Sequence, residues 1–76
     1  MTQADFLREF AELLGEPAAE VQLETDLTSL AGWDSMGQLS TLSVLDELGA
    51  PPPRGALQQC RKVRDVVALA ESRLTP

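Results

Sequence analysis

Ser35 lies in the hexapeptide GWDSMG, where it follows a carboxylate and stands between two glycines. A serine nucleophile needs a general base to take its proton, and that base is most often histidine. The sequence has no histidine, Lys62 is its only lysine, and its G-x-x-S-x-G spacing differs from the G-x-S-x-G of a nucleophile elbow. A domain this small also encloses little space for a substrate. We therefore expect no catalytic residue at Ser35 and no enzymatic activity in the chain.

Two other roles are open to Ser35. An Asp-Ser pair before an apolar run is typical of a helix start, where either side chain accepts hydrogen bonds from the first turn. If Asp34 alone caps the helix, Ser35 becomes the first helical residue and its hydroxyl points outward. An anionic group attached there would meet the positive end of the helix and its unpaired N–H groups. The position suits a phosphoester, and capping by the serine is the plainer alternative.

The elements that position Ser35 are predicted from apolar spacing. Helices are expected over residues 2–14, 35–48 and 63–74, with a short extra helix over residues 54–60. In the first helix one face carries Phe6, Leu7, Phe10, Leu13 and Leu14. Thr2 and Asp5 have the spacing of a capping box, and Gly15 is a fitting stop.

The second predicted helix, residues 35–48, is expected to begin at the N-cap Asp34 and to end at Gly49. Gly37 in its first turn costs roughly 1 kcal/mol relative to alanine. Its apolar residues cover more of the circumference than one stripe, so we expect some of them to meet solvent or a partner. They are Met36, Leu39, Leu42, Val44, Leu45 and Leu48.

Residues 15–34 show no sustained periodicity and contain Pro17, several hydroxyl residues and two glycines. A loop of about 20 residues is uncommon in a compact domain and is usually functional. Apolar residues along it would pin it to the helices: Val21, Leu23, Leu27 and Leu30. With no strand pattern, the fold class is all-α, a bundle of three to four helices with a long first loop and a short third helix. One domain is expected over residues 1–76.

Composition excludes several classes of function. The net charge of −6 disfavours nucleic acid as a partner and suits either docking on basic protein patches or simple solubility. No apolar run approaches the roughly 20 residues that span a bilayer, and the start lacks a signal peptide. We expect a cytoplasmic protein without a membrane partner. The single cysteine, Cys60, provides neither a disulfide nor a metal site.

The stretch DLTSLAGWDSMGQLSTLSVLDELG resembles the centre of an acyl carrier protein, and the likeness extends over nearly the whole chain through VRDVVALAESRL. In that family the Asp-Ser-Leu motif opens the second helix, and its serine carries a 4'-phosphopantetheine arm transferred from coenzyme A. The resemblance implies that Ser35 is the attachment site and that Asp34 and Met36 are the flanking motif. The arm's thiol would hold acyl groups as thioesters.

The resemblance also implies partners. They are a phosphopantetheinyl transferase, an acyl- or aminoacyl-loading enzyme, and a ketosynthase or other tailoring enzymes that act on a monomeric, stand-alone carrier. Fatty-acid carriers are strongly acidic along the exposed face of the second helix. Here we assign to that face Gly37, Gln38, Ser40, Thr41 and Ser43. This composition favours polyketide or related specialised biosynthesis. The alternatives are an aminoacyl or peptidyl carrier of a non-ribosomal peptide pathway and an unmodified helical interaction module.

At four positions the residue either has two possible roles or differs from the residue that the family usually has. Met36 replaces the usual leucine and either packs in the core or contacts a partner. Trp33 either shields the phosphate of the arm or pins the loop, and we favour pinning. Lys62 stands where the family has a capping Thr or Ser, so the start of the last helix is expected to fray. Cys60 is expected to be a buried, unreactive thiol.

Lys62 also belongs to the only basic cluster, which Arg61 and Arg64 complete. This cluster is interpreted either as a solvated face or as a docking contact.

Overall fold

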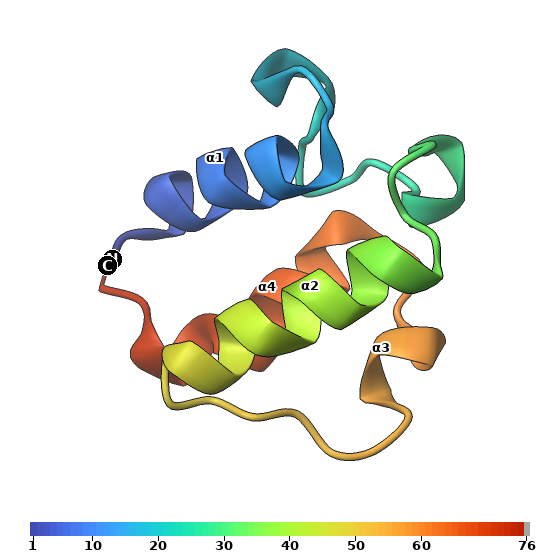
Figure 1. Ribbon diagram of the computed structural model, residues 1–76. Helices are drawn as coiled ribbons and strands as arrows, with labels where there is room; N and C mark the ends of the chain where they lie inside the picture. The colour runs from blue at the N-terminus through green and yellow to red at the C-terminus, as the bar shows by residue number, and fades with distance from the viewer. Residues whose placement is uncertain (76) are drawn as a thin grey trace.

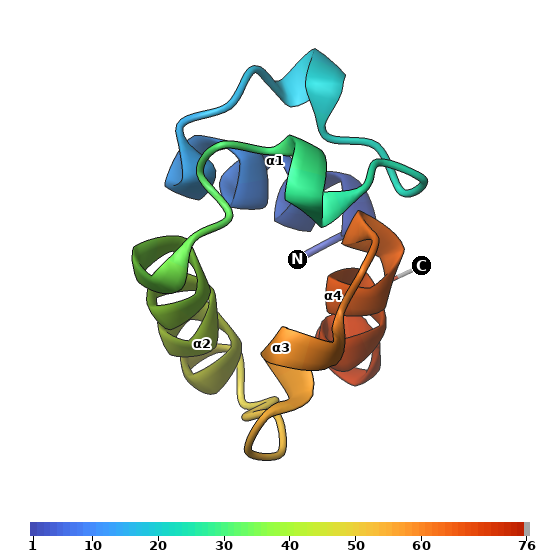
Figure 2. The same ribbon diagram turned by 90° about the vertical axis from the view of Figure 1, so that its right-hand side faces the viewer.

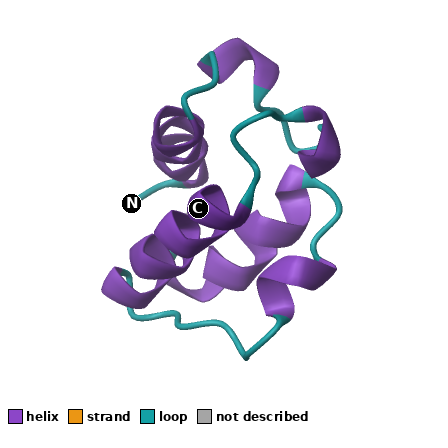
Figure 3. Cartoon of the chain, turned by 45° about the vertical axis from the view of Figure 1, so that its right-hand side comes forward, coloured by secondary structure: helices purple, strands orange, loops and turns teal. Residues whose placement is uncertain are grey.

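The computed structural model describes residues 1–75, and this part of the chain contains four α-helices and no β-strand (Figures 1 and 3). The helices are α1 (Gln3–Leu14), α2 (Ser35–Glu47), α3 (Ala56–Gln59) and α4 (Val63–Ala70). Three short 3₁₀ helices join them: η1 (Ala18–Glu20), η2 (Leu27–Ser29) and η3 (Glu71–Arg73). The prediction of a small helical bundle with a long first loop and a short third helix is confirmed.

The helices surround one apolar core. Figure 2 shows α2 and α4 on opposite sides of the molecule, with α1 and the first loop at one end and α3 at the other. Phe6 and Phe10 stack from α1 with ring centroids 6.2 Å apart. Side chains from α2, α4 and the loop meet them, and the largest of those that are fully buried are Leu27, Leu45, Val63 and Val66. Removal of this apolar surface from water is the main force that holds the helices together.

Helix α1 begins and ends as its sequence predicts. The Asp5 amide donates to Thr2 Oγ1 at 3.1 Å, and the Thr2 amide donates to Asp5 Oδ2 at 3.3 Å, which completes the capping box. The hydrogen bond from the Thr2 backbone, more than any other contact, holds the pKa of Asp5 below its ordinary value. At the other end Gly15 adopts a left-handed conformation, with φ of 71°, and its N–H donates to carbonyl groups of the last turn.

The first loop is ordered by burial and by backbone pairing with the start of α4. Val21, Leu27 and Leu30 are buried, as predicted from their apolar character. Leu27 N donates to Arg61 O at 2.8 Å, while the amides of Val63 and Arg64 donate to loop carbonyls at 3.0 Å each. The pairing supplies partners to N–H groups that a helix start otherwise leaves unsatisfied. It therefore fixes the loop and α4 in one unit.

The Asp65 carboxylate caps the start of α4, where the N-cap residue is Lys62. Its Oδ2 accepts hydrogen bonds from the amides of Arg61 and Lys62, both at 3.0 Å. Lys62 itself carries no acceptor on its side chain. The predicted frayed start of α4 is wrong, because the Asp65 carboxylate and the loop carbonyls satisfy the first N–H groups. The two backbone hydrogen bonds, that from Lys62 first, hold the pKa of Asp65 below its ordinary value.

The bounds of α3 and α4 differ most from the prediction. The short helix expected over residues 54–60 spans only Ala56–Gln59, since Gly55 has a φ of 83° and cannot continue a right-handed helix. The last helix, expected to reach Leu74, tightens into η3 after Ala70. Leu74 is then extended, with φ of −98° and ψ of 140°, and Thr75 N donates to Met1 O at 2.9 Å. None of the helices in residues 1–75 is long and apolar enough to cross a bilayer.

The hydrogen bonds to Asp65 predict a pH-dependent contribution to stability. Because the native pKa lies below the unfolded value of about 3.9, the contribution is complete above that value and is lost as the pH falls through the native pKa. We expect Asp65→Ala to lower the melting temperature by several degrees at pH 7 and by progressively less below pH 4. Thermal unfolding followed by circular dichroism measures both. Asp46→Ala is the control, since the Asp46 side chain caps no helix; an Asp65 effect that stays constant down to pH 2 would contradict the assignment.

Candidate functional site

Ser35 is the first residue of α2 and is exposed to solvent. Asp34 precedes it in an extended conformation, and its Oδ1 accepts a hydrogen bond from Gly37 N at 2.9 Å. The predicted N-cap at Asp34 is therefore confirmed, and the Ser35 hydroxyl is not needed to cap the helix. The hydroxyl stands at the positive end of a 13-residue helix.

Both glycines of the GWDSMG stretch are required by close packing. A Cβ on Gly37 would lie 2.1 Å from the carbonyl oxygen of Gly32, and a Cβ on Gly32 would lie 2.0 Å from that of Leu14. No side chain fits at such distances, so the end of α1, the loop and the first turn of α2 meet backbone to backbone. This contact holds the start of α2 in place beneath Ser35.

The same contact determines which face of α2 is buried. Gly37, Thr41 and Leu45 lie one turn apart and face the core, and Thr41 Oγ1 donates to Gly37 O at 2.8 Å. The assignment of Gly37 and Thr41 to the exposed face is wrong, because only small residues fit against the loop. Large apolar side chains face outward instead: Met36 is 70% exposed, Leu39 59% and Leu42 40%. The expectation that some apolar residues of this helix meet solvent is confirmed.

The two residues beside the Asp-Ser pair have different environments. Met36 is exposed, so core packing is excluded and its side chain is free to contact a partner. Trp33 is half-buried, and its ring meets that of Phe10 edge to face with centroids 5.8 Å apart. Trp33 thus ties the end of the loop to α1, as the pinning interpretation predicts.

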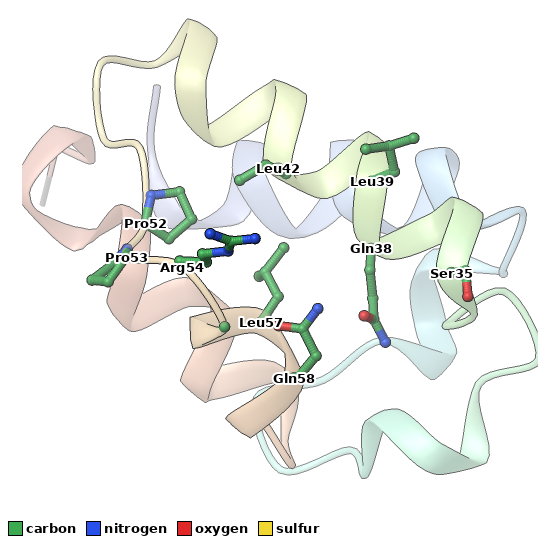
Figure 4. A pocket seen from close by; sticks show the side chains of 10 residues that line it. Ser35, Gln38, Leu39, Leu42, Pro52, Pro53, Arg54, Leu57 and Gln58 are labelled. Carbon is green, nitrogen blue, oxygen red and sulfur yellow. The ribbon is translucent and has the colours of Figure 1, made fainter.

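A groove of about 480 Å³ runs from Ser35 between α2 and the segment 52–58 (Figure 4). Its apolar wall consists of Leu39, Leu42, Pro52, Pro53 and Leu57. The polar side chains of Gln38 and Gln58 extend into it from α2 and α3, and Arg54 lies at the end away from Ser35. An apolar groove with a few polar groups is the usual form of a small-molecule site.

Most basic side chains of this acidic protein are paired away from the groove. Glu24 pairs with Arg64 at 2.8 Å and with Lys62 at 3.7 Å, and Lys62 also lies 3.9 Å from Asp26. Two members of the predicted basic cluster are thus occupied by acids of the first loop. Arg54 forms no ion pair with any residue of the described chain, and it is the one charged side chain that lines the groove.

The surroundings of Cys60 lower the reactivity of its thiol. The Cys60 thiol is half-buried and donates weakly to Ala56 O at 3.4 Å. Burial first, and then the nearby Asp65 carboxylate, raise the pKa of this thiol, so it is less reactive than a free cysteine. Residues 1–75 contain no group of three His, Cys, Asp or Glu side chains arranged to hold a metal ion.

Comparison with known proteins finds no family model, curated protein or solved structure that matches the chain.

Sequence reasoning missed several residues of the site. Arg54, Pro52 and Pro53 reach the groove because the connection after α2 folds back toward Ser35, which no local pattern indicates. The close contact of Gly32 with Leu14 has no local signal in the sequence either. Asp65 had a usable signal, since it stands three residues after Lys62 at the spacing of a capping box.

The glycine packing predicts an effect opposite to that of helix propensity. In an ordinary exposed helix Gly→Ala stabilises by about 1 kcal/mol. Here Gly37→Ala is expected to destabilise the protein by about 1–3 kcal/mol, since the new methyl group overlaps the Gly32 carbonyl. Urea unfolding at neutral pH measures the change. Ser43→Ala, at an exposed position of the same helix, is the control; stabilisation by Gly37→Ala would disprove the close contact.

Proposed function

We propose that this chain is an acyl carrier protein in which Ser35 bears a 4'-phosphopantetheine arm. The observation that carries the proposal is the exposed Ser35 hydroxyl, which stands at the start of α2 beside an open groove while Asp34 supplies the cap. The resemblance of the sequence to carrier proteins runs through the same residues. The helical bundle with a long first loop and a short third helix supports the assignment further.

The attachment reaction requires little of the carrier. The Ser35 oxygen attacks the phosphorus that bears the pantetheine of coenzyme A, and a new P–O bond forms as the pyrophosphate P–O bond breaks. Adenosine 3',5'-bisphosphate leaves, and the hydroxyl proton passes to a base on the transferase. The Ser35 side chain is exposed to solvent and therefore accessible to the transferase, and the chain has no histidine to serve as a base of its own. Its role is that of a substrate.

The residues around Ser35 fit such an arm and the enzymes that act on it. The phosphate would lie near the N-terminal end of α2, where the helix dipole favours negative charge. The bound arm supplies a terminal thiol that holds acyl groups as thioesters. Any enzyme that reaches Ser35 must cover the first turns of α2, where Met36 and Leu39 present apolar surface. The transferase, the loading enzyme and a ketosynthase or tailoring enzyme would share this surface.

The composition of that surface supports a specialised pathway over primary fatty-acid synthesis. Apolar and uncharged side chains predominate on the exposed part of α2, and its acidic residues are confined to Asp46 and Glu47 at the far end. Polyketide or related biosynthesis is our first proposal. An aminoacyl or peptidyl carrier of a non-ribosomal peptide pathway is the alternative within the same class.

The decisive test is the intact mass of the protein after incubation with coenzyme A and a broad-specificity phosphopantetheinyl transferase. We expect a gain of one phosphopantetheine group in the wild type and complete loss of that gain in Ser35→Ala. Ser43→Ala, a serine exposed on the same helix, should be modified as readily as the wild type.

A folded wild-type protein that gains no mass under these conditions would overturn the proposal. That outcome would favour an unmodified helical interaction module in which Ser35 only begins the helix. Circular dichroism of the same sample separates this result from loss of fold.

A further inference from the structure

Gly37 is held on three sides, although it lies only two residues after the exposed Ser35. Its N–H donates to Asp34 Oδ1 at 2.9 Å, and its carbonyl accepts a hydrogen bond from the buried Thr41 hydroxyl at 2.8 Å. On the third side a Cβ would lie 2.1 Å from Gly32 O, so the backbone at Gly37 contacts the loop directly. The first turn of α2 is therefore fastened to its surroundings through Gly37.

The loop end that packs against α2 is itself fixed to α1. A Cβ on Gly32 would lie 2.0 Å from Leu14 O, and the Trp33 ring meets the Phe10 ring edge to face. Because Gly32 and Trp33 are consecutive, both contacts hold the same short piece of backbone. The start of α2 thus has a fixed position relative to α1, and the exposed Ser35 takes its position from that backbone.

We infer that Gly37 is a positioning residue for the transfer of the phosphopantetheine group, in which the Ser35 oxygen bonds to phosphorus, adenosine 3',5'-bisphosphate leaves and the hydroxyl proton passes to the transferase. The inference rests on the proposed function. The attacking oxygen must lie within about 3–3.5 Å of the phosphorus, and a misplacement of about 1 Å can cost about 100-fold in rate. Relief of the 2.1 Å contact between a Gly37 Cβ and Gly32 O moves the two backbones apart by about 1 Å or more.

An added methyl group can be accommodated in two ways, and both displace Ser35. If the first turn bends away from the loop, Ser35 moves relative to the rest of α2. If the turn unwinds, the hydrogen bond from Gly37 N to Asp34 is lost and Ser35 leaves its helical conformation. Leu39 and Leu42 lie beyond this turn and are 59% and 40% exposed, so the apolar surface for docking is retained. The change should therefore slow the reaction of the bound carrier more than it weakens binding.

The experiment measures how fast a broad-specificity phosphopantetheinyl transferase modifies Gly37→Ala, with coenzyme A in excess and the carrier concentration varied. Intact mass reports the product. We expect kcat to be about 10- to 100-fold lower than for the wild type, and KM to change by less than about twofold. Sucrose, which stabilises folded states, is present for every protein, and circular dichroism confirms that each variant is folded.

Docking is measured without chemistry by competition. Ser35→Ala cannot be modified, so it inhibits modification of the wild type by occupying the transferase. We expect Ser35→Ala and the double variant Ser35→Ala/Gly37→Ala to have equal inhibition constants, since the surface beyond the first turn is the same in both. Much weaker inhibition by the double variant would assign Gly37 to docking and would overturn the inference.

Val66→Ala is the matched control for lost stability, because Val66 is fully buried in α4. It should leave kcat and KM at the wild-type values. Gly32→Ala places a Cβ 2.0 Å from Leu14 O, disturbs the same contact from the loop side and should lower kcat as Gly37→Ala does. If one of the two glycine variants does not fold, the other decides by the same criterion.

A folded glycine variant that is modified with the wild-type kcat, or an equal fall in kcat for Val66→Ala, would overturn the inference while the proposed function stands. A wild-type protein that gains no mass from coenzyme A would overturn both. The mass spectrum identifies that case before any rate is measured.

Discussion

The structure depends on one backbone contact, in which the first turn of α2 lies against the loop carbonyl of Gly32 and the loop lies against the carbonyl of Leu14. Because a methyl group is already too large at Gly37, the helix can face the core only with its small residues at this end. Its rotation is thereby fixed, and Met36 and Leu39 must point outward. A glycine within a helix costs about 1 kcal/mol relative to alanine. The close packing of Gly37 against the loop offsets this cost.

The charged side chains of the molecule are distributed unevenly around the exposed face of α2. The first turns of α2 are apolar on their outer face, and most of the acidic residues that give the chain its charge of −6 lie outside this helix. Glu24 of the first loop is bound by Arg64 and Lys62 at the start of α4. These ion pairs connect the first loop to the start of α4. Arg54 remains as the one charged side chain that lines the groove.

Burial and exposure in this protein fit the carrier role that we propose for Ser35. The core is filled by Phe6, Leu27, Leu45 and other apolar side chains, and residues 1–75 contain no metal-binding cluster. The Cys60 thiol is held less reactive by its surroundings. What is open to solvent is the Ser35 hydroxyl with its groove. A carrier needs this combination, since its partners supply the bases, metals and pockets for the chemistry.

Sequence alone determined the helices, because apolar spacing, the Thr2–Asp5 capping box and the Asp34 cap are local properties of the chain. It also identified Ser35 as an exposed helix start in a chain without histidine. Tertiary structure decided the rotation of α2, the groove that Arg54 completes and the closure of α4 by loop carbonyls. These features depend on contacts between segments far apart in sequence, and no periodicity encodes how closely two backbones approach.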